Sequence, residues 1–290
     1  GIRYGLVGAI VLGYAIVAAP RWYPTSIADF VGILLVGVFM IGAHHAFLYL
    51  GMQYISGAVA AVVVSLSPVL TAVFSSSMLT DSDLTLKKIA GLLLGLAGVV
   101  IISDLGFGAV TNASTVGLVL ALLASASFAF GSVATRPVRT DLPVSTLQGH
   151  GIIVGATLLW ITAVLRGESI TAISWTSQGL GSLAFLVIGP GVIAFLVYFH
   201  LLDSIGPLES NLIAYLEPIV ATVLSWLVLG ELIESSTVIG FLAIVVGFGF
   251  VKHRTLGVQF HMFIDRHVRH ASTVQSGSEP SSGDSTSNSD

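Results

Sequence analysis

The stretch Val64–Leu70 reads VSLSPVL, and 150 residues later Ala214–Val220 reads AYLEPIV. Each is an apolar run with a proline near its centre and a polar residue directly before that proline. A proline inside a helix has no N–H to donate and clashes with the preceding turn, so it kinks the helix. The two stretches therefore predict two helices that are kinked at matching places, at Pro68 and at Pro218.

The composition indicates that these runs lie in a membrane. Of the 290 residues, 54% are apolar and 9% are charged, whereas about 25% are charged in an ordinary soluble domain. The uncharged runs have about the twenty residues that cross a hydrocarbon core roughly 30 Å thick as a helix. The sequence thus predicts an all-α membrane protein with the lipid bilayer as a partner. The net charge of −4 gives no indication of nucleic acid, and the absence of cysteine excludes a disulfide framework.

Nine transmembrane helices are predicted, separated by polar, turn-rich stretches. Within a few residues at each end they occupy 2–19, 28–52, 57–79, 87–103, 115–135, 145–165, 179–202, 208–229 and 236–252.

Basic residues predict the orientation, because Lys and Arg are retained on the cytoplasmic side. With the gaps numbered alternately, one side receives only Arg3 and Arg166. The other side receives Arg21, Lys87, Lys88, Arg136, Arg139, Lys252, Arg254, Arg266 and Arg269. We therefore expect a multi-pass protein of the plasma membrane with a cytoplasmic C-terminus. Residues 253–290 form its tail, disordered after about residue 272 because they are rich in Ser, Gly and acids.

The chain contains an internal duplication with an offset of 150 residues. The offset aligns Ile55 with Ile205, Leu66 with Leu216, Pro68 with Pro218 and Val73 with Val223. Five spans separate each position from its mate, so the two copies cross the membrane in opposite senses. Inverted repeats of this kind are typical of secondary transporters, whose substrate site lies near mid-membrane between the halves.

The two copies differ in their number of helices. The first, residues 1–103, holds four predicted helices, and the second, residues 115–252, holds five. We therefore expect a further helix ahead of residue 1, which gives ten spans arranged as five plus five.

These features resemble the EamA family of the drug/metabolite transporter superfamily. The resemblance covers residues 1–252. It is carried by GAVAAVVVSLSPVLTAVFSS from Gly57 and AYLEPIVATVLSWLVLGELI from Ala214, and by the glycine-spaced helices that follow each of them. It implies an exporter or exchanger of amino acids and other small metabolites, without nucleotide-hydrolysing domains. Two departures from the family pattern are LTDSD from Leu79 in place of LGE, and GPG at 189–191.

The kinks also point to a site. Pro68 frees the carbonyl of Val64, Pro218 frees that of Ala214, and in lipid such carbonyls must face protein or water. Ser67 precedes the first proline and Glu217 precedes the second. We expect each half to contribute one kinked helix to a common central cavity, with the prolines as hinges. The alternative is a kink that neighbouring helices merely tolerate.

Glu217 is the sharpest candidate, because a carboxylate at the bilayer centre costs about 2.5 kcal/mol or more and should face the bundle interior. It could bind a proton or a cationic group of the substrate, or, protonated, hydrogen-bond a neighbouring helix. His44 and His45 lie near the middle of their span. Adjacent residues of a helix diverge by about 100°, so at most one of these histidines is expected to face the cavity. Proton transfer and interhelical hydrogen bonding both remain open for them.

Other candidate binding residues are Ser65, Tyr215 and Asn211 on the kinked helices. Lesser candidates are Tyr49 and Tyr198 beside these helices, and Gln148, His150 and Trp160 in the span 145–165, where a structural role at the membrane interface is favoured for Trp160. Gly189, Pro190 and Gly191 fall in the middle of the span 179–202, where an unwound stretch and tight helix packing are equal alternatives. The spacing of the histidines predicts no metal site.

A secondary transporter is the leading interpretation, and an intramembrane enzyme that uses His44, His45 and Glu217 is its rival. The sequence contains no HExxH, no GxSxG and no cysteine nucleophile. We therefore expect no enzymatic activity and no cofactor. The expected partner is a small-molecule substrate, and a second copy of the chain is kept open as a further partner.

Overall fold

The computed structural model describes residues 1–80, 85–102, 112–169, 171, 173–216, 220, 223, 227, 235 and 238–251. No strand occurs among them, so the predicted all-α fold is confirmed. Glu217, Pro218 and the tail 253–290 lie outside the described residues.

The described helices follow the predicted spans closely, and the predicted span 208–229 is described continuously only as far as residue 216. They are α1 (Ile2–Ala18), α2 (Ile27–Leu34), η1 (Leu35–Ala43), α3 (His44–Gly51), α4 (Gly57–Val64), α5 (Ser67–Met78), α6 (Leu86–Ile102), α7 (Asn112–Ala134), α8 (Val144–Leu165), α9 (Ser177–Val187), η3 (Ile188–Ile193), α10 (Ala194–Ile205), α11 (Pro207–Asn211) and η4 (Leu212–Tyr215), with a further helix at Val238–Val251. Five of the described helical stretches are long and apolar enough to cross a membrane: 27–51, 59–78, 115–134, 144–165 and 177–205.

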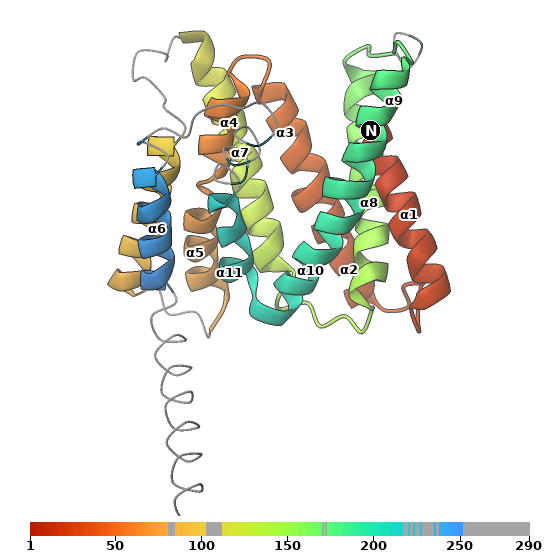
Figure 1. Cartoon of the computed structure of the whole chain (residues 1–290). Helices are drawn as coiled ribbons and strands as arrows, with labels where there is room; N and C mark the ends of the chain where they lie inside the picture. The colour runs from red at the N-terminus through yellow and green to blue at the C-terminus, as the bar shows by residue number, and fades with distance from the viewer. Residues whose placement is uncertain are drawn as a thin grey trace, which may run out of the picture.

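Successive spans run in opposite directions, and their connections alternate between two ends of the bundle (Figure 1). At the lower end in Figure 1, the Thr140 hydroxyl donates a 2.6 Å hydrogen bond to the Asp29 carboxylate and joins the α7–α8 connection to α2. At the upper end, the Arg166 guanidinium donates to Gln53 at 3.0 Å. The described connections thus alternate between the ends in the order that the predicted topology requires.

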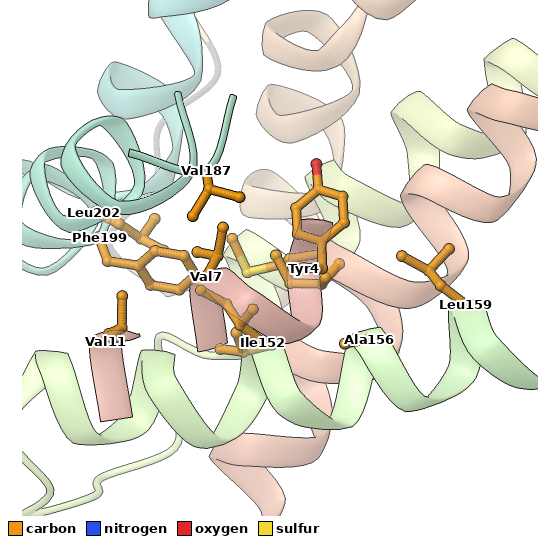
Figure 2. Packing of buried hydrophobic residues seen from close by; sticks show 12 residues of the cluster. Tyr4, Val7, Val11, Ile152, Ala156, Leu159, Val187, Phe199 and Leu202 are labelled. Atoms are coloured by element: carbon orange, nitrogen blue, oxygen red, sulfur yellow. The ribbon is translucent and has the colours of Figure 1, made fainter. Parts of the chain in front are cut away.

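One core joins α1, η1, α8 and the α9–α10 region. Figure 2 shows Tyr4, Val7 and Val11 of α1 facing Ile152 of α8, beside Val187 and Phe199. A second core surrounds Tyr215 and joins α5, α6, α11, η4 and the helix Val238–Val251. The long helix α7 contacts α3, α4, α5, η1 and α11 and so connects the two groups.

The span 57–79 is broken, as its proline predicts. Helix α4 ends at Val64, a turn follows, and α5 begins at Ser67 with Pro68 in its first turn. A proline is favourable there, because the first N–H groups of a helix have no intrahelical partner in any case. Pro68 therefore allows the second half of the span to begin as a new helix.

Two other spans carry π-helical segments at related positions. The first segment is η1 (Leu35–Ala43) and the second is η3 (Ile188–Ile193). Shifted by 150 residues, the first segment covers 185–193 and overlaps the second. The unwound stretch considered for the GPG sequence is not observed: the backbone stays helical, with a wider turn that tolerates Pro190.

Candidate functional site

A cavity of about 430 Å³ lies between the break in the span 57–79 and the α11–η4 segment. Its walls come from α3, α4, α5, α7, η3, α10, α11 and η4. Aromatic side chains dominate its apolar lining, namely Phe128, Phe195 and Tyr198. No charged side chain lines it among the described residues. The cavity therefore suits a small molecule with an apolar body.

Several residues predicted from the sequence meet in this cavity. His44, His45, Ser67, Asn211 and Pro190 all line it. Val64 and Ala214, the residues whose carbonyls the two prolines were predicted to free, line it as well. Both histidines line the cavity, although adjacent residues of a helix diverge by about 100°. Eight helical segments bound the cavity, so it is wide enough to meet both rings in spite of their angular separation.

The carbonyl of Val64 has found a partner on another helix. The Ser125 hydroxyl of α7 donates to this carbonyl at 3.3 Å. Ser67 lies 3.0 Å from the same Ser125 oxygen. Because Ser125 has a single hydroxyl proton and directs it at Val64, Ser67 donates to Ser125. The polar residue before Pro68 thus completes a short chain of hydrogen bonds that fixes the break against α7.

His45 is fully occupied by hydrogen bonds within the protein. Its Nδ1 lies 2.8 Å from the Ile41 carbonyl, and a carbonyl oxygen only accepts, so Nδ1 carries the proton. In the neutral ring Nε2 is then an acceptor, and the Tyr4 hydroxyl donates to it. Tyr4 is buried beside the ring, with the two ring centroids 4.4 Å apart. His45 therefore links α1 to α3 and has no free nitrogen to offer a ligand.

His44 differs from its neighbour in this respect. Its Nδ1 lies 2.9 Å from the Ala124 carbonyl and must likewise donate. Its Nε2 accepts no hydrogen bond from any described residue, and the side chain lines the cavity. The rings of His44 and His45 meet edge to face, with centroids 4.6 Å apart. His44 thus lines the cavity with a ring whose Nε2 is unpaired among the described residues, while its other nitrogen is held by α7.

Asn211 forms three hydrogen bonds to three other helices. Its Nδ2 donates to Thr71 of α5 at 2.6 Å and to Ser132 of α7 at 3.0 Å. Its Oδ1 accepts from the Tyr198 hydroxyl of α10 at 2.6 Å. The side chain is 2% exposed. Both amide protons are therefore used within the protein, and Asn211 cannot donate to a ligand unless one of these bonds opens.

Other predicted residues do not line the cavity. The Ser65 hydroxyl donates to the Ala61 carbonyl of its own helix at 2.9 Å. Tyr215 turns toward α6, where its hydroxyl donates to the Leu92 carbonyl at 2.8 Å. Of the three residues in GPG, only Pro190 lines the cavity, and Gly191 packs against Val7 of α1. A Cβ at Gly191 would lie 2.5 Å from Val7 Cγ2, so tight helix packing explains this glycine.

Sequence reasoning did not single out several residues that the structure brings to the site. They are Tyr4, Thr71, Ser125, Phe128, Ser132 and Phe195. Only the serines and the threonine gave a signal, because hydroxyls inside otherwise apolar spans tend to form bonds between helices. No group of three or more His, Asp or Glu side chains that could hold a metal ion occurs among the described residues.

Comparison with known proteins assigns the chain to a family. The EamA-like transporter family matches residues 1–104 and 115–252. The uncharacterized transporter YvbV of Bacillus subtilis is 30% identical over 88% of this chain and 82% of its own length. The uncharacterized inner membrane transporter YedA of Escherichia coli K12 is 27% identical over 80% of this chain and 78% of its own length.

A solved structure, described only as a crystal structure of a protein, shares the fold. It has a TM-score of 0.73 and 21% sequence identity, over 88% of this chain and 87% of its own. The family match, the relatives and the apolar helices agree with the resemblance noted in the sequence. The chain belongs to the EamA-like transporter family and is a multi-pass membrane transporter.

Proposed function

We propose that the protein is a secondary transporter that exports or exchanges small metabolites such as amino acids across the plasma membrane by alternating access. The observation that carries this proposal is a departure from regular α-helix on two sides of one cavity: the break between α4 and α5, and the change from α11 to the 3₁₀ segment η4. Val64 and Ser67 line the cavity from the first break, and Asn211 and Ala214 line it from the region of the second. Each half thus contributes the same kind of wall.

The two breaks share one hydrogen-bond pattern. The Leu66 N–H donates to the Val63 carbonyl at 3.1 Å, three residues back, and Leu70 donates to Leu66 at 3.0 Å. At positions 150 residues later, Leu216 donates to Ile213 at 2.8 Å, and Val220 donates to Leu216 at 3.0 Å. A tightened turn at matching places supports two related halves that meet at the cavity and could move against each other.

The π-helical segments support the same interpretation. η1 and η3 lie at overlapping positions of the two halves, and each leads into a helix whose residues line the cavity. Such segments are frequent at functional sites, because their weaker hydrogen-bond ladder can rearrange locally. In this mechanism the two halves rock about the cavity, and the breaks and π-helical segments absorb the change in backbone angles.

Substrate binding in this cavity would use a hydrogen-bond donor of the solute. The side chain of His44 lines the cavity and its Nε2 accepts from no described residue, while His45 and Asn211 are engaged within the protein. We therefore expect a solute with an apolar or aromatic body and an N–H or O–H group directed at His44. Glu217, expected at the cavity from the sequence, would bind a proton or a cationic group. A gradient would supply the energy, since the sequence has no phosphate-binding loop.

Counterflow in liposomes tests the proposal. Vesicles containing the purified full chain are loaded with an unlabelled amino-acid mixture, and the uptake of single labelled amino acids from outside is followed. Transient accumulation above equilibrium, absent from protein-free vesicles, is the expected result. Chemical conversion of the solute without flux would support the intramembrane enzyme instead, and binding without flux or conversion would exclude both.

A further inference from the structure

A second cavity of about 550 Å³ lies at the lower end of the bundle in Figure 1. Its walls are the end of α7, the connection to α8, the first turn of α8 and the last turns of α10. Four charged side chains line it: Arg136, Arg139, Asp141 and Asp203. It therefore differs from the central cavity, whose described lining is uncharged.

Three of these charged groups are available to a ligand. Arg139, Asp141 and the carboxylate of Asp203 form no ion pair and no side-chain hydrogen bond with another described residue. Arg136, by contrast, donates to the backbone carbonyl of Asp203 at 2.9 Å and ties the end of α7 to the end of α10. The second cavity thus offers one free cation and two free anions among its described residues to the polar groups of a solute.

The two cavities meet at the hydrogen bonds of Asn211. Asn211 and Tyr198 line the central cavity, whereas Ser132 lines the second one. The 3.0 Å bond from Asn211 Nδ2 to Ser132 Oγ therefore joins the wall of one cavity to the wall of the other. Thr71 and Ser132 are fully buried, and Asn211 is 2% exposed, so these groups leave no solvent-filled passage at this point.

The same side chain also ties together elements that transport would have to separate. Thr71 lies on α5 of the first half, while Ser132, Tyr198 and Asn211 lie on α7, α10 and α11 of the second half. All three bonds are between uncharged groups, whose net contribution is small enough for a conformational change to break them. The geometry is that of a closed but reversible barrier.

We propose that the second cavity is a loading site for the transported solute, and that Asn211, with Thr71, Ser132 and Tyr198, closes the passage from it to the central cavity. The inference rests on the proposed transport function. The solute's charged groups would meet Arg139 and Asp141 first, and its body would enter the central cavity once the bonds of Asn211 open. From the distribution of basic residues, the loading site faces the cytoplasm.

The chain has no cysteine, so single introduced cysteines report accessibility without background. Ala194→Cys places a thiol in the central cavity, and Val138→Cys places one in the second cavity. The full-length variants are labelled with a membrane-impermeant maleimide in vesicles of both orientations. The face that labels position 138 faster identifies the side to which the second cavity opens, and the reagent is then applied on that face.

Opening the barrier should raise the accessibility of position 194 in the central cavity and leave that of position 138 in the second cavity unchanged. Thr71→Val removes one bond of Asn211 and should raise the labelling rate at position 194 on the order of tenfold, since one net hydrogen bond changes an equilibrium by about this factor. Asn211→Ala removes all three bonds and should raise the rate at least as much. Thr71→Ser keeps the hydroxyl and should label like the parent. Position 138 should label equally in all backgrounds, which also shows that the variants are folded.

Unchanged labelling at position 194 in both Asn211→Ala and Thr71→Val overturns the barrier. The same holds if Thr71→Ser raises the rate as much as Thr71→Val, because the hydroxyl would then be irrelevant. Labelling does not depend on flux. A positive labelling result without counterflow therefore contradicts the transport function and not the barrier, whereas counterflow without a labelling difference contradicts only the barrier.

Discussion

The hydroxyl of Ser125 donates a hydrogen bond to the backbone carbonyl of Val64 at 3.3 Å. Pro68 has no backbone N–H, so this carbonyl lacks its usual intrahelical donor. The hydroxyl of Ser125 on α7 replaces that donor. The break in the span 57–79 is therefore held by α7. A proline kink in a membrane helix is tolerated where a neighbouring side chain satisfies the freed backbone in this way.

Removal of this donor is expected to destabilise the protein. Ser125→Ala leaves the Val64 carbonyl without its donor and Ser67 with only the longer 3.5 Å bond to the residue 125 backbone carbonyl. It should lower the free energy of unfolding by about 1 kcal/mol. Denaturation of the purified protein in detergent, followed by circular dichroism, measures the change. Ser77→Ala is the matched control, because Ser77 is exposed and bonds only within its own helix. Equal losses in both variants would contradict the role assigned to Ser125.

The two ring nitrogens of His44 are expected to serve different purposes: Nδ1 stabilises the fold, and Nε2 contributes to affinity for the solute. Asn places its amide nitrogen near the position of histidine Nδ1, and Gln places its amide group near that of Nε2. His44→Asn should therefore keep the bond to the Ala124 carbonyl and the stability of the protein. It should raise the solute concentration that gives half-maximal counterflow about tenfold, since it removes one hydrogen-bond acceptor from the cavity. His44→Gln should retain most of the affinity. Concentration-dependent counterflow measures both, and equal affinities in the two variants would exclude a direct contact with the solute.

The Tyr4 hydroxyl donates a hydrogen bond to His45 Nε2. Tyr4→Phe removes this hydroxyl and keeps the aromatic ring. Tyr4→Phe leaves Nε2 of His45 without a donor, and the unfolding free energy should fall by roughly 1–3 kcal/mol because a buried acceptor is then unsatisfied. In protein labelled with nitrogen-15 at histidine, the Nε2 resonance of His45 should move while that of His44 stays. If the His44 resonance moved equally, the assignment of Tyr4 to His45 alone would be wrong.

Gly191 predicts a steric limit between η3 and α1. A Cβ there would lie 2.5 Å from Val7 Cγ2, so Gly191→Ala should cost about 1–3 kcal/mol of stability by overpacking. Val7→Ala combined with Gly191→Ala should cost less than the sum of the single changes, because the clashing methyl group is gone. Gly181→Ala serves as the control, since nothing lies within 4 Å of its added Cβ. Thermal unfolding in detergent reports all four variants.

The sequence by itself determined the spans and the place of the first break. Hydropathy acts over a window of consecutive residues, and a proline removes the N–H of its own position, so both effects can be read locally. Helix α8 (Val144–Leu165) begins and ends within one residue of the predicted span 145–165. The turn before Pro68 lies where the VSLSPVL stretch predicted it.

Only the tertiary structure decided which polar groups face the cavity. Ser65 and Ser67 are two residues apart on the same span, yet the first bonds its own helix and the second bonds α7. Tyr215 and Asn211 are four positions apart in the sequence. The Tyr215 hydroxyl nevertheless bonds Leu92 of α6, whereas Asn211 bonds three other helices. These outcomes depend on the rotation of each helix and on partners up to 140 residues away, such as Thr71 for Asn211. A local sequence pattern does not predict such distant contacts, because they depend on how the helices pack against one another.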